Sequence, residues 1–262
     1  MKRVLLGNIH PEIAIGLNNV AFAVYEQRKY DEAELLFREA LEMQRTLVGD
    51  NHPDVAMALN NLAFVVHDKG DLNNALELSK SALNTYKRSV GAEHPSVARG
   101  MSNLAMWMME ADQLVLAEPM LREALELRKR ILGPEHADVA GTMTLLAGLL
   151  IETRRYEEAR TLAADARALY VNALGPDHWR TATATNAEGA ALAGLKRSDQ
   201  VEALLLESHA VLHQDKAVMR YFMNRSDRWL AKLYQTTGRP EKAAKYLVQA
   251  RRVDLSVRYF DG

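Results

Sequence analysis

The chain has no cysteine at any of its 262 positions, which excludes disulfide bonds and thiolate metal sites. It also lacks any run of the roughly 18 apolar residues that a membrane-spanning helix needs. The first six residues, MKRVLL, contain too short an apolar stretch for a signal peptide. We therefore expect a cytoplasmic protein that does not bind a membrane.

A strong excess of either charge is also missing. The chain has 33 Lys and Arg against 34 Asp and Glu, for a formal net charge of −1. Residues 1–150 contain 15 basic and 20 acidic residues, and residues 201–262 contain 11 and 7. This asymmetry is too weak to indicate nucleic acid or an anionic membrane surface as a partner.

What the sequence does contain is a 42-residue repeat. Residues 49–91 form one unit, in which two periodic apolar runs are separated by Gly70 and Asp71 and followed by Gly91. A fixed period of this size is typical of a solenoid, in which each unit buries its apolar face against its neighbours. Two columns keep the step: His10, His52, His94, His136 and His178, and Gly7, Gly49, Gly91, Gly133 and Gly175.

Each unit predicts a pair of helices. The first helix of the 49–91 unit has His52 at its N-cap and Pro53 at its first position, where the missing N–H costs nothing. The second helix is expected from about Leu72 to Val90, and Gly91 ends it. The spacing i, i+3, i+4, i+7 predicts a buried stripe on the first helix, consisting of Leu59, Leu62, Ala63 and Val66.

Small residues recur in three columns, spaced by 12 and then 7 positions, and they let two antiparallel helices approach closely. This spacing is that of the tetratricopeptide repeat. The columns are Ala21, Ala63, Ala105, Ala147, Gly189 and Ala231; Ala33, Ala75, Ala117, Ala159, Val201 and Ala243; and Ala40, Ala82, Ala124, Ala166, Ser208 and Ala250.

Residues 48–63, which read VGDNHPDVAMALNNLA, resemble the 42-residue repeat of kinesin light chains, a unit also found in bacterial signalling proteins. Residues 32–41, EAELLFREAL, match the second half of that repeat. The resemblance implies an all-α, right-handed superhelical solenoid of antiparallel helix pairs that binds proteins or peptides. Residues 233–246 also resemble the end of helical-repeat tails on bacterial Ser/Thr protein kinases, although the chain has no kinase catalytic motif.

These patterns predict three segments. Residues 1–9, with Leu5 and Leu6, match the end of a second helix and are interpreted as the tail of a truncated preceding repeat. Residues 10–219 form five 42-residue repeats. Residues 220–262 form a degenerate sixth repeat, which its arginines make polar, as expected of a cap. Either the chain is a segment of a longer protein, which we favour, or helix 11–27 has an uncovered apolar flank through which the chain self-associates. The arginines are Arg225, Arg228, Arg239, Arg251, Arg252 and Arg258.

Catalytic and metal sites are not expected. Packed helices lie about 8–10 Å apart, so histidines of successive repeats cannot share an ion at bonds of about 2 Å. We interpret the histidine column as helix caps or inter-repeat hydrogen bonds. Catalytic groups do not recur in the sequence, which predicts no enzyme and no cofactor.

The helix face opposite the buried stripe is the predicted binding surface. In the tetratricopeptide architecture this face lines the concave side, and apolar residues on it indicate an interaction surface. Asparagines there suit the unpaired backbone groups of an extended peptide. Asn19, Asn61 and Asn103 form a column at steps of 42 residues, and Leu145 replaces asparagine in the fourth repeat. We therefore expect the groove in the first three repeats. The predicted peptide-binding residues, acidic column included, are Asn18, Asn19, Phe22, Glu26, Met57, Asn60, Asn61, Phe64, Asp68, Arg99, Asn103, Met106, Glu110 and Glu152.

The acidic column, Glu26, Asp68, Glu110 and Glu152, lies in the last turn of four first helices, where the helix dipole disfavours carboxylates. We therefore predict a basic partner segment with one or two apolar anchors. The alternative is that the carboxylates are solvated and offset by Arg28, Lys69, Arg154 and Arg155. Other functions left open are a regulatory region of a larger signalling kinase or ATPase, and a structural spacer without a peptide ligand.

Overall fold

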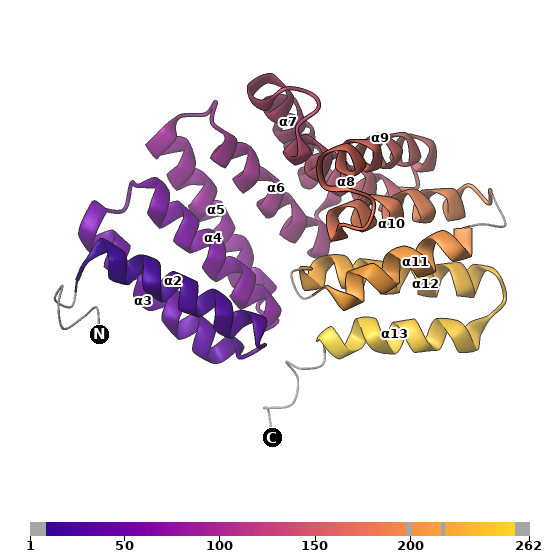
Figure 1. Cartoon of the computed structure of the whole chain (residues 1–262), viewed down its shortest axis with the longest axis horizontal. Helices are drawn as coiled ribbons and strands as arrows, with labels where there is room; N and C mark the ends of the chain where they lie inside the picture. Colours follow the sequence, from indigo (N-terminus) through magenta and orange to yellow (C-terminus); the bar gives the residue numbers. More distant parts are fainter. Residues whose placement is uncertain (1–8, 198–200, 216–217, 255–262) are drawn as a thin grey trace. The chain divides into compact units, whose positions relative to one another are not determined.

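The computed structural model describes residues 9–197, 201–215 and 218–254, with side chains up to residue 250. These residues form twelve helices and no strand, which follow one another along the chain as six successive pairs (Figure 1). The predicted all-α fold class is confirmed. The pairs are α2 (Pro11–Glu26) with α3 (Tyr30–Val48), α4 (Pro53–Asp68) with α5 (Leu72–Val90), α6 (Pro95–Glu110) with α7 (Leu114–Leu132), α8 (Ala137–Glu152) with α9 (Tyr156–Leu174), α10 (Trp179–Gly194) with α11 (Val201–Gln214), and α12 (Arg220–Thr236) with α13 (Pro240–Asp254).

The chain divides into two compact units, Met1–Ala117 and Glu118–Gly262, here called the N-terminal and C-terminal units. The boundary falls within α7. The limits of the predicted repeats, including the cap, remain predictions. Leu5, Leu6 and Arg258 lie outside the described residues, and so do the side chains of Arg251 and Arg252.

The histidine column caps the first helix of five pairs. In each case the imidazole Nδ1 accepts the backbone N–H two residues further on, at 3.0 to 3.2 Å. This satisfies one of the N–H groups that a helix start leaves without a partner. The capping interpretation is confirmed for His10, His52, His94, His136 and His178.

The turn between the two helices of every pair contains a residue with positive φ, again at a step of 42. Glycine occupies the position in two pairs, at Gly70 and Gly238, and accepts this conformation without a steric penalty. The other four pairs place a side chain in the same left-handed conformation, with φ between 55° and 62°: Arg28, Asp112, Arg154 and Lys196.

The core of the N-terminal unit is built on the small-residue columns. Ala21, Ala63 and Ala105 are 0% exposed, and so are Ala33 and Ala75. Large apolar side chains of neighbouring helices pack around them, and the predicted stripe on α4 is buried as expected. These larger residues include Phe37, Leu59, Leu62, Val66, Tyr86 and Trp107.

The C-terminal unit is organised around α8, whose Leu146, Leu149 and Leu150 are 0% exposed. The predicted polar cap needs one correction here, because Arg225 of α12 is buried rather than solvent-facing. Its guanidinium lies over the rings of Tyr221 and Trp229, at 5.3 and 5.0 Å. Gly148 makes this possible, since a Cβ there would lie 2.3 Å from an Arg225 nitrogen.

Candidate functional site

Asparagine pairs join the first helices of the N-terminal unit. Asn61 of α4 donates a hydrogen bond from Nδ2 to Oδ1 of Asn18 in α2, at 3.0 Å. Asn103 of α6 makes the same bond to Asn60, at 2.8 Å. An amide has two N–H donors and one carbonyl acceptor, so each bond uses one donor of Asn61 or Asn103 and leaves the rest of that amide for other groups.

Solvent exposure divides the predicted binding residues into two groups. Phe22 is 42% exposed and Met57 37%, and Ile15 of the same helix face as Phe22 is 58% exposed. Asn19, Glu26 and Arg99 are also exposed, and Asn18, Asn61, Phe64, Asn103 and Glu110 are half-buried. In contrast, Met106, Asn60 and Asp68 are buried, at 1%, 8% and 8% exposure. The accessible surface is therefore narrower than the sequence spacing predicts.

The two middle carboxylates of the acidic column bind one imidazole. His67 of α4 lies between them, with Nδ1 3.0 Å from Asp68 and Nε2 2.6 Å from Glu110 of α6. The Tyr25 hydroxyl of α2 donates to the other oxygen of Asp68, at 2.6 Å. We call Tyr25, His67, Asp68 and Glu110 the N-terminal cluster. It links three successive first helices.

His67 is protonated at neutral pH. Burial lowers its pKa, but the hydrogen bonds and charges of Asp68 and Glu110 outweigh that effect and raise the pKa to about 9. The ring also stacks on Trp107, with centroids 4.1 Å apart, and Phe64 meets the same indole edge-on at 5.1 Å. His67 was not among the predicted residues, although it directly precedes Asp68 and lies 43 residues before Glu110, the same step that separates the paired asparagines.

This arrangement corrects the expected environment of the acidic column. The basic residues named as its neighbours are engaged elsewhere or shape turns: Lys69 pairs with Asp31 and Glu34 at 2.6 and 2.7 Å. Arg155 pairs with Glu118 and Glu158, and Arg28 and Arg154 are left-handed turn residues. Glu152, in the C-terminal unit, accepts the indole N–H of Trp229 at 3.4 Å and lies 3.9 Å from Arg225. Glu26 is exposed.

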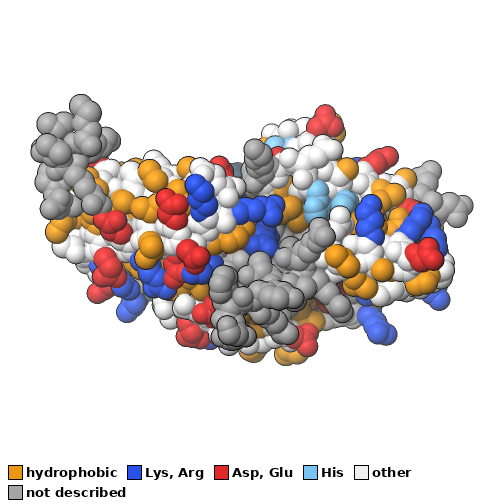
Figure 2. Space-filling model, turned by 90° about the horizontal axis from the view of Figure 1, so that it is seen from below, with side chains coloured by type: hydrophobic (Ala, Val, Ile, Leu, Met, Phe, Trp, Pro, Cys, Tyr) orange, Lys and Arg blue, Asp and Glu red, His pale blue; other side chains and the backbone are white. Residues whose placement is uncertain are grey.

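The exposed surface does not present one charge. Figure 2 shows acidic and basic side chains interspersed with hydrophobic ones on the face drawn. The predicted binding surface of the N-terminal unit has the same mixture within one sequence column, since Arg99 follows Ile15 and Met57 at steps of 42 residues. The Arg99 guanidinium donates to the Tyr86 hydroxyl at 2.9 Å. The surface thus combines amide, apolar and mixed charged groups.

A cavity of about 570 Å³ in the C-terminal unit was not predicted. Ala190 and Gly194 of α10 line it, together with apolar groups of α8 and α12. Three cationic side chains stand at it: Lys196, Arg197 and Lys232. Its volume is that of a small-molecule site. Sequence periodicity does not reveal it, because small residues in a column normally mark close packing.

Comparison with known proteins identifies the family. The tetratricopeptide repeat model matches residues 12–88, 54–130, 96–170 and 138–213. The chain belongs to the tetratricopeptide repeat family. Its fold is a protein-interaction scaffold. No curated protein matches the chain. None of the helices in the described part of the chain has the length and apolar composition needed to cross a membrane.

Solved structures show the same fold at low identity. RapI in its apo form is 18% identical, with a TM-score of 0.75 over 97% of this chain and 89% of that one. A Rap protein complexed with competence and sporulation factor is 13% identical, with a TM-score of 0.69 over 92% and 74%. Nearly identical TPR-like repeats of a kinesin light chain from Podosopora anserina are 20% identical, with a TM-score of 0.55 over 79% and 99%. The predicted resemblance to kinesin-light-chain-like and bacterial helical repeats is confirmed.

Proposed function

We propose that this protein binds an extended peptide or protein segment along α2, α4 and α6 of the N-terminal unit and catalyses no reaction. The observation that carries this proposal is the asparagine column, Asn19, Asn61 and Asn103, which keeps amide groups available beside exposed apolar side chains. Amides can pair with the backbone N–H and C=O groups of an extended segment, which has no partners of its own.

The segment carries an apolar anchor. Ile15, Phe22 and Met57 are each more than a third exposed on the adjacent helices α2 and α4. Contiguous exposed apolar groups on a soluble protein mark interaction surfaces. The asparagine pairs hold α2, α4 and α6 in register, so the anchors are displayed on a fixed frame. Such preorganisation reduces the entropy cost of binding.

The bound segment also carries a basic residue, next to its apolar anchor and facing Glu26 of this chain. We expect fewer basic residues in the bound segment than a continuous acidic column would favour, because Asp68 is buried and Glu110 bonds to the His67 cation. Those two carboxylates and one imidazolium sum to a single negative charge. Glu26 is exposed one helical turn beyond Phe22. One Lys or Arg near the apolar anchor of the segment can therefore form an ion pair with it.

A peptide array tests the proposal, with apolar, basic and acidic residues varied systematically in 15-residue peptides and the best binder measured by fluorescence anisotropy. Asn61→Ala and Phe22→Ala are expected to weaken binding about tenfold each, and Glu26→Lys to weaken basic peptides selectively. Asn84→Ala and Glu32→Lys are the matched controls, since both residues are exposed on second helices. Equal effects of the site and control variants, or a preference for acidic peptides, contradict the proposal.

Self-association is the alternative that the exposed flank of α2 favours, since Val20 is 52% exposed. A second copy of the chain is then the partner. Sedimentation velocity separates the two functions: Val20→Asp lowers the apparent mass at high concentration if α2 self-associates. A monomer at all concentrations removes this alternative and leaves peptide binding untouched.

A further inference from the structure

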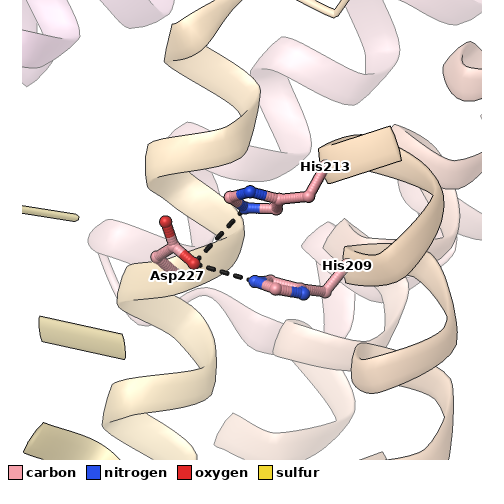
Figure 3. Close-up of side chains that lie close together, drawn as sticks. All are labelled: His209, His213 and Asp227. Atoms are coloured by element: carbon pink, nitrogen blue, oxygen red, sulfur yellow. Dashed lines mark hydrogen bonds and ion pairs between the residues drawn. The ribbon is translucent and has the colours of Figure 1, made fainter. Parts of the chain in front are cut away.

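Two histidines and an aspartate converge in the C-terminal unit. His209 and His213 are four residues apart on α11, so they lie on the same face of that helix one turn apart. Asp227 of α12 faces them. Its Oδ1 lies 2.8 Å from Nε2 of His209 and 3.4 Å from Nε2 of His213 (Figure 3). We call these three residues the C-terminal cluster.

The cluster is preorganised and accessible from one side. Asp227 is 1% exposed, so its carboxylate is fixed among packed side chains. The two imidazoles stack with centroids 4.1 Å apart, and Tyr246 of α13 meets His209 edge-on at 5.3 Å. The His213 side chain is 31% exposed. An ion can therefore enter past His213 and meet three donor atoms that already lie close together.

The spacing of the donor atoms suits a transition metal. The three ligand atoms lie within 4.8 Å of one another. Two ligands at tetrahedral angles, each about 2.0–2.1 Å from Zn²⁺, are about 3.3 Å apart. The observed distances of 2.8 and 3.4 Å from the carboxylate oxygen to the two imidazole nitrogens lie on either side of that value, and side-chain rotations would bring all three donor atoms to the spacing that the ion needs.

We propose that His209, His213 and Asp227 bind one divalent transition-metal ion, Zn²⁺ in the first place. Imidazole and carboxylate ligands suit zinc, and also nickel, copper and cobalt. Three protein ligands leave a fourth position, on the side of the exposed His213, for water or for a donor group of a partner. The ion links α11 to α12 and so fastens the last two helix pairs.

The test uses the full untagged chain, stripped of metal by a chelator and titrated with ZnCl₂ in a calorimeter and with CoCl₂ in a spectrophotometer. One equivalent of zinc is expected to bind, with release of protons from the ligands. Cobalt is expected to give the intense visible bands of a tetrahedral site. The affinity is expected to fall about tenfold or more in His213→Gln and in Asp227→Asn.

The matched control is His136→Asn. It removes an exposed imidazole from a helix start, and asparagine is a good N-cap in its place. Zinc binding unchanged in this variant and weakened in His213→Gln supports the proposal. The proposal is overturned if wild type shows no saturable zinc binding and no tetrahedral cobalt spectrum, or if the control loses as much affinity as His213→Gln. Circular dichroism shows whether each variant is folded. If a variant is unfolded, the cobalt spectrum of the wild-type chain is the measurement that decides.

Discussion

The two units contain clusters of the same side-chain types in opposite ratios. In the N-terminal unit one imidazole, His67, lies between two carboxylates, at 3.0 and 2.6 Å. In the C-terminal unit one carboxylate, Asp227, lies between two imidazoles, at 2.8 and 3.4 Å. The N-terminal cluster joins three first helices and the C-terminal cluster joins a second helix, α11, to the next first helix, α12; both place their central group in the interior.

The ratio decides the chemistry. Both ring nitrogens of His67 donate hydrogen bonds, so the ring is a cation with no lone pair for a metal, and its pKa is raised to about 9. The C-terminal cluster has one acceptor for two rings, and its imidazole nitrogens can turn their lone pairs toward a shared ion. Burial raises the pKa of Asp227, but hydrogen bonds from His209 and His213 outweigh this and lower it. One cluster is a fixed ion pair and the other is a ligand set.

The largest expected effect comes from removing the central cation of the N-terminal cluster. His67→Leu leaves Asp68 and Glu110 without their shared partner, and breaking a buried ion pair in this way costs about 3–5 kcal/mol. Asp227→Asn keeps an acceptor for the imidazoles and is expected to cost less, about 1–2 kcal/mol. Urea unfolding measures both, with hydrogen exchange in α4 and α12 locating the loss. Equal costs would show that the two clusters do not differ as described.

The N-terminal cluster also predicts a loss of stability in alkaline solution. The pKa of His67 is about 9 in the folded chain against 6.5 in a model compound. Because the folded value is raised, the stabilisation is fully present below pH 6.5 and is lost as the pH rises through 9. The rise of the pKa from 6.5 to about 9 corresponds to at most about 3 to 4 kcal/mol. Unfolding at pH 6 and pH 9.5 measures it, and His67→Gln is expected to lose this dependence. A midpoint near 6.5 for the His67 resonance in NMR would contradict the account.

The fold was largely predictable because it depends on columns that recur every 42 residues. A small residue recurs at the Ala105 position of all six pairs and a capping histidine at the His52 position of five, so one copy explains much of the others. The functional features were less predictable because they depend on side chains that occur once. His67 has no counterpart in its column, and Asp227 meets His209 through the packing of α11 on α12. Burial of Met106 also depends on the stacking of neighbouring helices rather than on its own helix.

Overpacking of the small-residue column tests whether the two units respond alike. Ala105→Leu in the N-terminal unit and Ala147→Leu in the C-terminal unit add the same side chain at equivalent positions that are both 0% exposed. Each is expected to cost about 1–3 kcal/mol, because the fully buried site has no room for the larger side chain. The control Ala23→Leu, on the exposed side of α2, should cost under about 0.5 kcal/mol. Hydrogen exchange should show each loss in its own unit, and a wild-type melting temperature for Ala105→Leu would refute the close-packing argument.

The smallest expected effect is a gain, from relieving the left-handed turns. Arg28 in the N-terminal unit and Arg154 in the C-terminal unit have φ of 62° and 61°, a conformation that costs a non-glycine residue about 1–2 kcal/mol. Glycine removes that cost but adds freedom to the unfolded chain, so Arg28→Gly and Arg154→Gly are each expected to stabilise by about 0.5 kcal/mol. Gly70, with φ of 95°, provides the reverse experiment, and Gly70→Ala should destabilise by about 1 kcal/mol. Urea unfolding of each variant beside the wild type measures these differences. The midpoint urea concentrations are compared, because with equal m-values a shift in the midpoint reports the change in stability. If Arg28→Gly were destabilising while Gly70→Ala had no effect, the turn column would not be strained, and its arginines would be stabilising through their side chains.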